Sequence, residues 1–246
     1  MKQSIYLLTT CLLLVSFLLP KQVTAFNDTQ FPAYEKAVWT SKKGSKLNYR
    51  ILYPKNFDQS KKYPLVLFLH GMGERGGDNE KQLTHGAQLF ADSIEQYPAI
   101  VLFPQCNTMD YWANVYRPDA GGKSRNYVFN TQEDYNQSLG MVAELTDHFL
   151  GQSFIDVNRF YVSGLSMGGF GVWELLWRMP EKIAAAAPIC GGGPVEMTNK
   201  MAEVPIWAFH GVDDAVVHSR FSRRMISALQ KHGGQAKISL YPGVNH

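Results

Sequence analysis

Apolar and polar residues alternate along the chain in blocks that predict strands and helices in turn. Short continuous apolar runs, typical of strands buried on both faces, occur at 65–69, 99–103, 160–162, 184–189, 206–209 and 238–241. Two earlier strands are expected at 38–39 and 47–53, with Gly44 in the turn between them. Apolar residues at helical spacing predict helices within 136–150, 168–179 and 221–229.

This alternation predicts an α/β protein, with a mostly parallel sheet and helices on both of its faces. The chain has 246 residues, of which 45% are hydrophobic and 18% charged, an ordinary balance for one globular domain. We find no repeat and no domain boundary. The longest segment without a periodic pattern is 105–134, and loops of that length in compact domains are usually functional or disordered.

The first 25 residues have a different character. Lys2 is followed by an apolar run at 5–19, Pro20 ends that run, and small residues stand at 23–25. This order is typical of a secretory signal peptide cleaved after Ala25, which leaves 26–246 as the mature domain. A membrane anchor is the alternative, but an apolar run of about 15 residues is shorter than the ~20 that span a bilayer. We therefore expect a secreted or periplasmic protein.

Charge and cysteine content limit the partners. The formal net charge is +3, and removing 1–25 takes away Lys2 and Lys21, which leaves 22 basic and 21 acidic residues. With no basic stripe, no nucleic-acid partner is expected, and no membrane contact is expected after cleavage. Cys106 and Cys190 remain in the mature chain. Export permits a disulfide between them, while two buried free thiols are the alternative, and the sequence leaves both open.

The strongest chemical signal is Gly164-Leu165-Ser166-Met167-Gly168, which matches G-x-S-x-G between a strand pattern and a helix pattern. In that context the motif indicates a nucleophilic serine on a tight strand-to-helix turn, where glycines avoid clashes. The N–H of Met167 can then point at a developing oxyanion. Ser163 is a rival serine, but it belongs to the strand and lacks the turn.

A serine of this kind needs a carboxylate and then a histidine later in the chain. His246 follows the last predicted strand by a short loop, which is where such a base belongs. Of the other histidines after Ser166, His210 fits a turn, His218 fits a helix cap or a loop, and His232 fits the end of a helix. Asp213 and Asp214 both follow the strand at 206–209, and either carboxylate could orient the imidazole.

The loop after the strand at 65–69 supplies the second oxyanion N–H in this arrangement, and Met72 is the expected donor, with Gly73 second. His70 is expected to be structural. The same loop also matches G-x-G-x-x-G at Gly71, Gly73 and Gly76, a dinucleotide fingerprint that should open directly into a helix. A polar loop follows instead, so no cofactor is expected. We find no metal-binding motif and expect no catalytic metal.

Several segments together resemble secreted bacterial α/β-hydrolases of the phospholipase/carboxylesterase and polyhydroxybutyrate-depolymerase-like esterase group, often labelled predicted peptidases. They are "LVLFLHGMGERGGDN", "FPQCNTMDYW", "RFYVSGLSMGGFGVWEL", "PICGGG", "PIWAFHGVDDAVV" and "YPGVNH", and the likeness covers nearly all of 36–246. The family pattern H-G-x-x-D-x-x-V maps onto His210, Gly211, Asp214 and Val217. This resemblance selects Asp214 as the triad acid.

The resemblance also implies further details. Family members commonly have cysteines where Cys106 and Cys190 stand, which adds some support to a disulfide and leaves the two free thiols as the alternative. Trp112 and Gln105, in or next to the "PQC" loop, are expected to contact substrate, with loop packing as the alternative for Trp112. Relatives usually continue beyond the catalytic histidine into a last helix. We therefore expect an α/β-hydrolase fold without the usual C-terminal helix, in a chain truncated after His246.

The expected activity is hydrolysis of carboxylic esters through an acyl-enzyme, with Ser166, His246 and Asp214 as the triad. The expected substrates are small-molecule esters or esters on plant polysaccharides, such as acetyl or feruloyl groups. A serine peptidase of the prolyl-oligopeptidase-like type is one alternative, because the same triad cleaves amides. A non-catalytic binding protein with an impaired triad is another, because a histidine at a chain end frays unless it is tied down.

Overall fold

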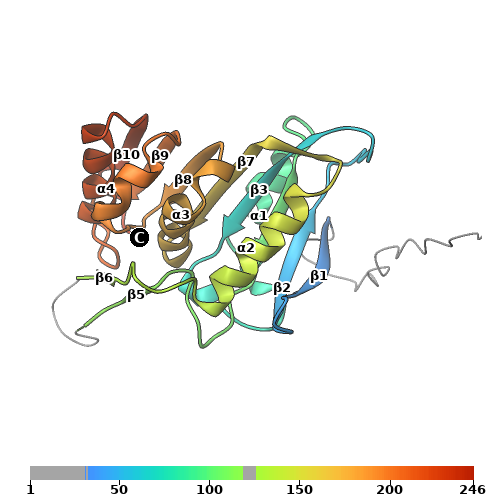
Figure 1. Ribbon diagram of the computed structural model, residues 1–246, viewed down its shortest axis with the longest axis horizontal. Coiled ribbons are helices and arrows are strands. Elements are labelled where there is room, and N and C mark those ends of the chain that lie inside the picture. Colours follow the sequence, from blue (N-terminus) through green and yellow to red (C-terminus); the bar gives the residue numbers. More distant parts are fainter. Residues whose placement is uncertain (1–30, 32, 119–125) are drawn as a thin grey trace, which may run out of the picture.

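A computed structural model describes residues 31, 33–118 and 126–246, so the predicted signal peptide at 1–25 lies outside the described residues. Within them, one eight-stranded sheet has the order β1-β2-β4-β3-β7-β8-β9-β10 (Figure 1). Its strands are β1 (Tyr34–Thr40), β2 (Lys46–Leu52), β3 (Tyr63–Leu69), β4 (Ile100–Pro104), β7 (Ile155–Leu165), β8 (Ala185–Ile189), β9 (Ile206–Gly211) and β10 (Ala236–Tyr241). β2 pairs antiparallel with β1 and β4, and the other neighbours are parallel.

Four α-helices and a small hairpin complete the described fold. The helices are α1 (Ala87–Ser93), α2 (Gln137–Leu150), α3 (Met167–Arg178) and α4 (Arg220–Lys231). The hairpin pairs β5 (Val115–Tyr116) with β6 (Val128–Phe129) inside the long loop. The mostly parallel sheet with helices confirms the predicted α/β-hydrolase architecture, and all eight predicted strands are present.

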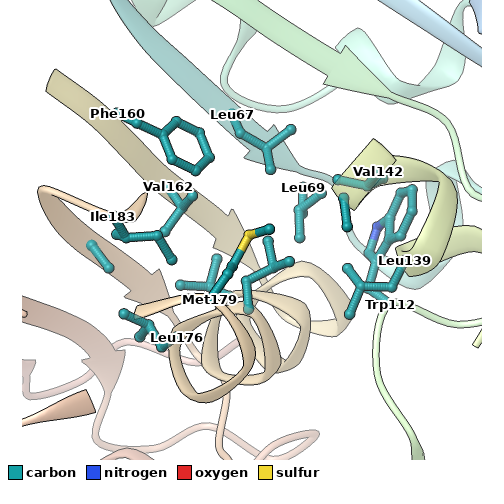
Figure 2. Close-up of a cluster of buried hydrophobic side chains, with 14 of the residues drawn as sticks. Leu67, Leu69, Trp112, Leu139, Val142, Phe160, Val162, Leu176, Met179 and Ile183 are labelled. Carbon is teal, nitrogen blue, oxygen red and sulfur yellow. The ribbon is translucent and has the colours of Figure 1, made fainter. Parts of the chain in front are cut away.

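Side chains alternate between the two faces of the sheet along each strand, so the core forms a cluster on each face. In β3, Leu67 and Leu69 are fully buried in the large cluster under α2 and α3, while Phe68 between them packs in a second cluster with α1. Figure 2 shows Leu67 and Leu69 beside Phe160 and Val162 of β7, above the turns of α3. Helices therefore cover both faces of the central strands, and β3 and β7 are held rigidly between them.

The elements that sequence patterns missed are short. α1 has seven residues and follows Gly86, whose φ is +86°. Helical periodicity needs a window of about 11–18 residues to stand out, so a helix of this length gives no pattern. β5 and β6 have two residues each and are defined by pairing across the loop rather than by composition.

After β10 the described residues 242–246 form a turn and an extended segment that ends at His246. Trp207 of β9 is 43% exposed, whereas its neighbour Ala208 is fully buried in the main core. The two faces of β9 are thus covered unequally.

Among the residues that the structure describes, no helix has the length and apolar composition to cross a membrane.

Candidate active site

Ser166 stands in a strained turn between β7 and α3. Its φ of 54° and ψ of −116° belong to a region that residues other than glycine rarely adopt. A Cβ atom at Gly164 would lie 2.7 Å from the carbonyl oxygen of Leu69, and one at Gly168 would overlap that same oxygen. The glycines of the motif therefore let the turn approach the end of β3, and this approach fixes the position of Ser166.

His246 connects Ser166 to Asp214 through two short hydrogen bonds. Its Nε2 is 2.8 Å from Ser166 Oγ, and its Nδ1 is 2.7 Å from Asp214 Oδ2. An ionised carboxylate only accepts hydrogen bonds, so Nδ1 carries the proton and Nε2 is free to accept from the Ser166 hydroxyl. The structure thus brings together the three residues that the sequence singled out, in the order that acyl transfer requires.

The surroundings of Asp214 keep it ionised. The residue is 3% exposed, and burial by itself raises a carboxyl pKa. The hydrogen bond from His246 and the N–H groups of Val217 and Val216, each 2.8 Å from Oδ1, outweigh that burial and lower the pKa of Asp214. A charged Asp214 can stabilise a protonated imidazole.

Asp213 has a different position from its neighbour. Its Oδ2 accepts the N–H of Gly243 at 2.8 Å, and its own N–H donates to the carbonyl of Val244 at 3.1 Å. Asn245 adds a third link, because its Oδ1 accepts the N–H of Ala215 at 2.8 Å. These bonds tie the segment before His246 to the loop that carries Asp214, so His246 is anchored in the described structure.

The two residues predicted to supply oxyanion N–H groups each stand at the start of a helical segment. Met167 is the first residue of α3, and Met72 is the first residue of a short 3₁₀ turn, Met72–Glu74. The first N–H groups of a helix have no acceptor within it, so neither of these N–H groups has a partner inside its own helical segment. The side chain of Met72 is 56% exposed, while Met167 is fully buried.

His70 fixes the loop that carries Met72. The Nδ1–H of this fully buried side chain donates to the carbonyl of Gly71 at 2.6 Å, and its Nε2 accepts the N–H of Cys106 at 3.0 Å. This arrangement needs a neutral imidazole, and burial lowers the pKa of His70 to about 4. The residue is structural, as the sequence indicated.

The dinucleotide alternative is not supported. After Gly76 the chain continues through bends and a 3₁₀ turn, Lys81–Leu83, and the next α-helix begins at Ala87. A dinucleotide fingerprint opens directly into a helix whose N-terminus holds the pyrophosphate. The glycines at 71–77 form the loop beside Ser166 instead: a Cβ atom at Gly71 would lie 3.8 Å from Ser166 Cβ.

The prediction that Trp112 and Gln105 contact substrate is contradicted by their burial. Trp112 is fully buried beside Leu139 and Val142 of α2 (Figure 2), and its Nε1–H donates to the carbonyl of His70 at 3.1 Å. Trp112 therefore follows the alternative that the sequence left open for it, packing within the protein. Gln105 is 2% exposed, and its side-chain amide is hydrogen-bonded to residues of the loop at 74–79. Both side chains hydrogen-bond to the segment 70–79, which contains Met72.

His210 lies near the end of β9, as expected from the apolar run before it, but it is buried next to the site instead of forming a turn. Its Nε2–H donates to the carbonyl of Val217 at 2.8 Å, and the same nitrogen is 3.3 Å from Asp214 Oδ2. Its Nδ1 is 2.8 Å from Ser222 Oγ. Burial lowers the pKa of His210, so the ring is neutral and holds the Asp214 loop by hydrogen bonds. The H-G-x-x-D spacing was the feature of the sequence that could have placed His210 beside Asp214.

The two cysteines of the mature chain are both free and buried, so the disulfide alternative is wrong for this structure. Cys190 follows β8 with a φ of +40°, and its N–H donates to the carbonyl of Phe209 at 2.9 Å. Burial raises the pKa of its thiol to about 11. Its sulfur lies close to the polar atoms of Asp214 and His246, a proximity that no sequence spacing indicated.

Comparison with known proteins identifies the family. A model of the phospholipase/carboxylesterase family matches residues 57–246, which is most of the chain. The chain therefore belongs to this family of α/β-hydrolases and is a hydrolase. The crystal structure of a thermostable esterase superposes with a TM-score of 0.75 at 35% sequence identity, covering 86% of this chain and 55% of the esterase chain.

Curated relatives include more than one activity. A bifunctional acetylxylan esterase/xylanase of Neocallimastix patriciarum is 31% identical over 156 residues, which are 63% of this chain and 20% of that protein. Dipeptidyl-peptidase 5 of Porphyromonas endodontalis is 24% identical over 249 residues, covering 86% of this chain and 34% of the relative. The chain thus spans about a fifth to a third of the length of these relatives.

The buried His70 should make stability depend on pH. Because burial lowers its pKa from 6.5 to about 4, only the unfolded chain binds a proton on this residue within that window. The contribution of neutral His70 to the free energy of unfolding is therefore complete above pH 6.5 and is lost as the pH falls towards 4. We expect a loss of up to roughly 3 kcal/mol in the free energy of unfolding, measured by urea denaturation across the window.

The control for this prediction is a second histidine. His70→Gln should reduce the dependence on pH, leaving the part that the buried His210 contributes, while lowering stability at every pH, since it removes one titrating ring and its hydrogen bonds. His232→Gln should retain the full dependence, because His232 is exposed at the end of α4. An identical pH profile for wild type and His70→Gln would contradict the assignment.

Proposed function

We propose that this hydrolase cleaves carboxylic esters through an acyl-enzyme, with Ser166 as nucleophile, His246 as base and Asp214 as the orienting acid. The observation that carries the proposal is the hydrogen-bonded chain from Asp214 Oδ2 through His246 to Ser166 Oγ, with separations of 2.7 and 2.8 Å. It contains a nucleophile, a base within reach of its proton, and a group that sets the tautomer of the base.

The steps follow from these contacts. His246 Nε2 takes the proton of Ser166 as Oγ attacks the ester carbonyl, and the N–H groups of Met72 and Met167 stabilise the resulting oxyanion. The imidazolium then protonates the departing alcohol, which leaves the acyl group on Oγ. Water, deprotonated by the same nitrogen, releases the acid and restores the hydroxyl. Asp214 stays ionised throughout and stabilises the charged imidazole.

We propose esters attached to plant polysaccharides as the substrate class, with small acyl esters as the simpler form of the same chemistry. The similarity to an acetylxylan esterase/xylanase supports this class. The hairpin β5–β6 also brings aromatic residues near the nucleophile. Tyr127 and Phe129 pack on Phe170, which is one helical turn beyond Ser166. Aromatic rings of this kind offer flat surfaces to a sugar or a feruloyl ring.

A peptidase is the second candidate, favoured by the similarity to a dipeptidyl-peptidase. The same triad attacks an amide, and the difference lies in the leaving group and in what anchors the substrate's amino end. A non-catalytic binding role has less support, because the polar contacts of the three residues are intact and the loop before His246 is held by Asp213 and Asn245.

We further propose that residues 1–25 are a signal peptide, that the hydrolase domain begins at residue 26, and that the protein acts outside the cytoplasm. The basic start, the apolar run and the small residues at 23–25 support export. Insoluble polysaccharide is found outside cells, so the proposed location and the proposed substrate class agree.

Ser166→Ala should abolish labelling by a fluorophosphonate probe and lower kcat for an aryl acetate by roughly 10⁶-fold, because no other group supplies the covalent step. Ser163→Ala is the matched control. Ser163 lies three residues earlier in β7 and donates its hydroxyl to the carbonyl of Ala187 at 2.8 Å, away from His246. It should label at the wild-type rate. Labelling that survives Ser166→Ala would refute the nucleophile.

The neighbouring aspartates provide a second test. Asp214→Asn should lower kcat by roughly 10⁴-fold, because an amide at this position favours the wrong tautomer of His246. Asp213→Asn keeps an oxygen that can accept the N–H of Gly243, so its kcat should fall less than about tenfold. If Asp213→Asn were the more damaging of the two, the assignment of the acid would be wrong.

A substrate panel separates esterase from peptidase. Acetylated xylan, a feruloylated oligosaccharide and an aryl acetate are compared with dipeptide aryl amides at equal concentration. We expect kcat/KM to be at least about 100-fold higher on the esters, since the alkoxide leaves more readily than the amine and nothing in the proposed site is assigned to an amino terminus. Faster cleavage of the dipeptide amides would favour the peptidase.

A further inference from the structure

Cys190 places a thiol next to the two polar members of the hydrogen-bonded chain. Its sulfur, a carboxylate oxygen of Asp214 and a ring nitrogen of His246 all lie within 4.8 Å of one another. These residues come from the ends of three neighbouring strands, since Cys190 follows β8, Asp214 follows β9 and His246 follows β10. The parallel order of these strands brings the three side chains to the same edge of the sheet.

The size of this cluster suits a small cation. Any three atoms within 4.8 Å of one another have a common point no more than about 2.8 Å from each of them. Zinc sites have Zn–S distances of roughly 2.3 Å and Zn–N or Zn–O distances of roughly 2.0–2.2 Å. Side-chain movements of less than about 1 Å per ligand would therefore complete a three-ligand site, with a fourth position open to water.

The kinds of donor atom narrow the choice of ion. Magnesium and calcium prefer sites built from oxygen, whereas a set of one sulfur, one imidazole nitrogen and one carboxylate oxygen suits zinc and similar borderline-soft ions. The site can also be reached from solvent. The His246 side chain is 24% exposed, although that of Asp214 is fully buried.

We propose that Cys190, Asp214 and His246 form an inhibitory binding site for Zn²⁺ or a similar thiophilic divalent cation. On binding, the thiol releases its proton to solvent and a metal–sulfur bond forms. The carboxylate of Asp214 gives a lone pair to the ion, and His246 binds it through a ring nitrogen without a proton; where that nitrogen is Nδ1, its proton moves to Nε2 through solvent. This disrupts the hydrogen-bonded chain that holds His246 against Ser166. The inhibition rests on the proposed function, while the metal site itself does not.

The site is tested first without any enzymatic readout. The protein is titrated with Co²⁺, a spectroscopic substitute for Zn²⁺, and the near-ultraviolet absorption that arises from a thiolate–cobalt bond is followed. We expect this band in the wild type, its loss in Cys190→Ser and its retention in Cys106→Ser. Cys106 is the matched control, because it is also a free and buried thiol but lies after β4. Excess Zn²⁺ should displace the cobalt and remove the band.

The second measurement follows the rate of fluorophosphonate labelling of Ser166 during a Zn²⁺ titration. Saturating Zn²⁺ should slow labelling of the wild type by at least about tenfold, and a chelator should restore the rate. In Cys190→Ser the concentration for half-inhibition should rise at least about tenfold, while Cys106→Ser should match the wild type.

The outcomes distinguish the two proposals. If the wild type gives no thiolate–cobalt band, or if Cys106→Ser loses the band while Cys190→Ser keeps it, the metal site is refuted. Zn²⁺ inhibition that is equal in wild type and Cys190→Ser refutes the inhibitory role. A protein that is not labelled in metal-free buffer refutes the proposed function, yet the cobalt band still decides the metal site. If Cys190→Ser does not fold, Cys190→Ala replaces it, and the wild-type band remains decisive.

Discussion

The close approach of two backbone segments is the constraint on which this site depends. The turn at Ser166 approaches the end of β3 so closely that a Cβ atom at Gly168 would overlap the carbonyl oxygen of Leu69. Packing on both sides of β3 and β7 holds that contact in place and keeps Ser166 at its unusual φ of 54°. Because the central strands are rigidly packed, the hydroxyl group of Ser166 has a fixed position.

Around that fixed point, most of the supporting residues act by hydrogen bonding to loops rather than by touching a substrate. His70 and Trp112 hold the loop that carries Met72, and His210 holds the loop that carries Asp214. Asp213 does the same for the segment before His246. Buried polar groups need partners, and here the partners are loop carbonyls and N–H groups, so burial itself makes the site rigid.

The same strand ends that create a hydrolase site also gather metal ligands. Parallel strands deliver their C-terminal loops to one edge of the sheet, and β8, β9 and β10 contribute a thiol, a carboxylate and an imidazole there. Membership of the phospholipase/carboxylesterase family accounts for the hydrolase, whereas the proposed cation site rests on the position of the Cys190 sulfur beside Asp214 and His246. The proposed cation site would therefore regulate this chain through residues that also serve its chemistry.

The sequence by itself determined the eight strands and the three long helices, because continuous apolar runs and helical periodicity are local signals. It also predicted the tight strand-to-helix turn at Ser166, because the glycines of G-x-S-x-G indicate such a turn, and the resemblance to a family pattern selected Asp214 over Asp213. Tertiary structure decided that Trp112 and Gln105 are buried, that Cys106 and Cys190 stay apart from each other as free thiols, and that His210 faces Asp214. These are contacts between segments far apart in the chain, which only the packing of loops against one another can set.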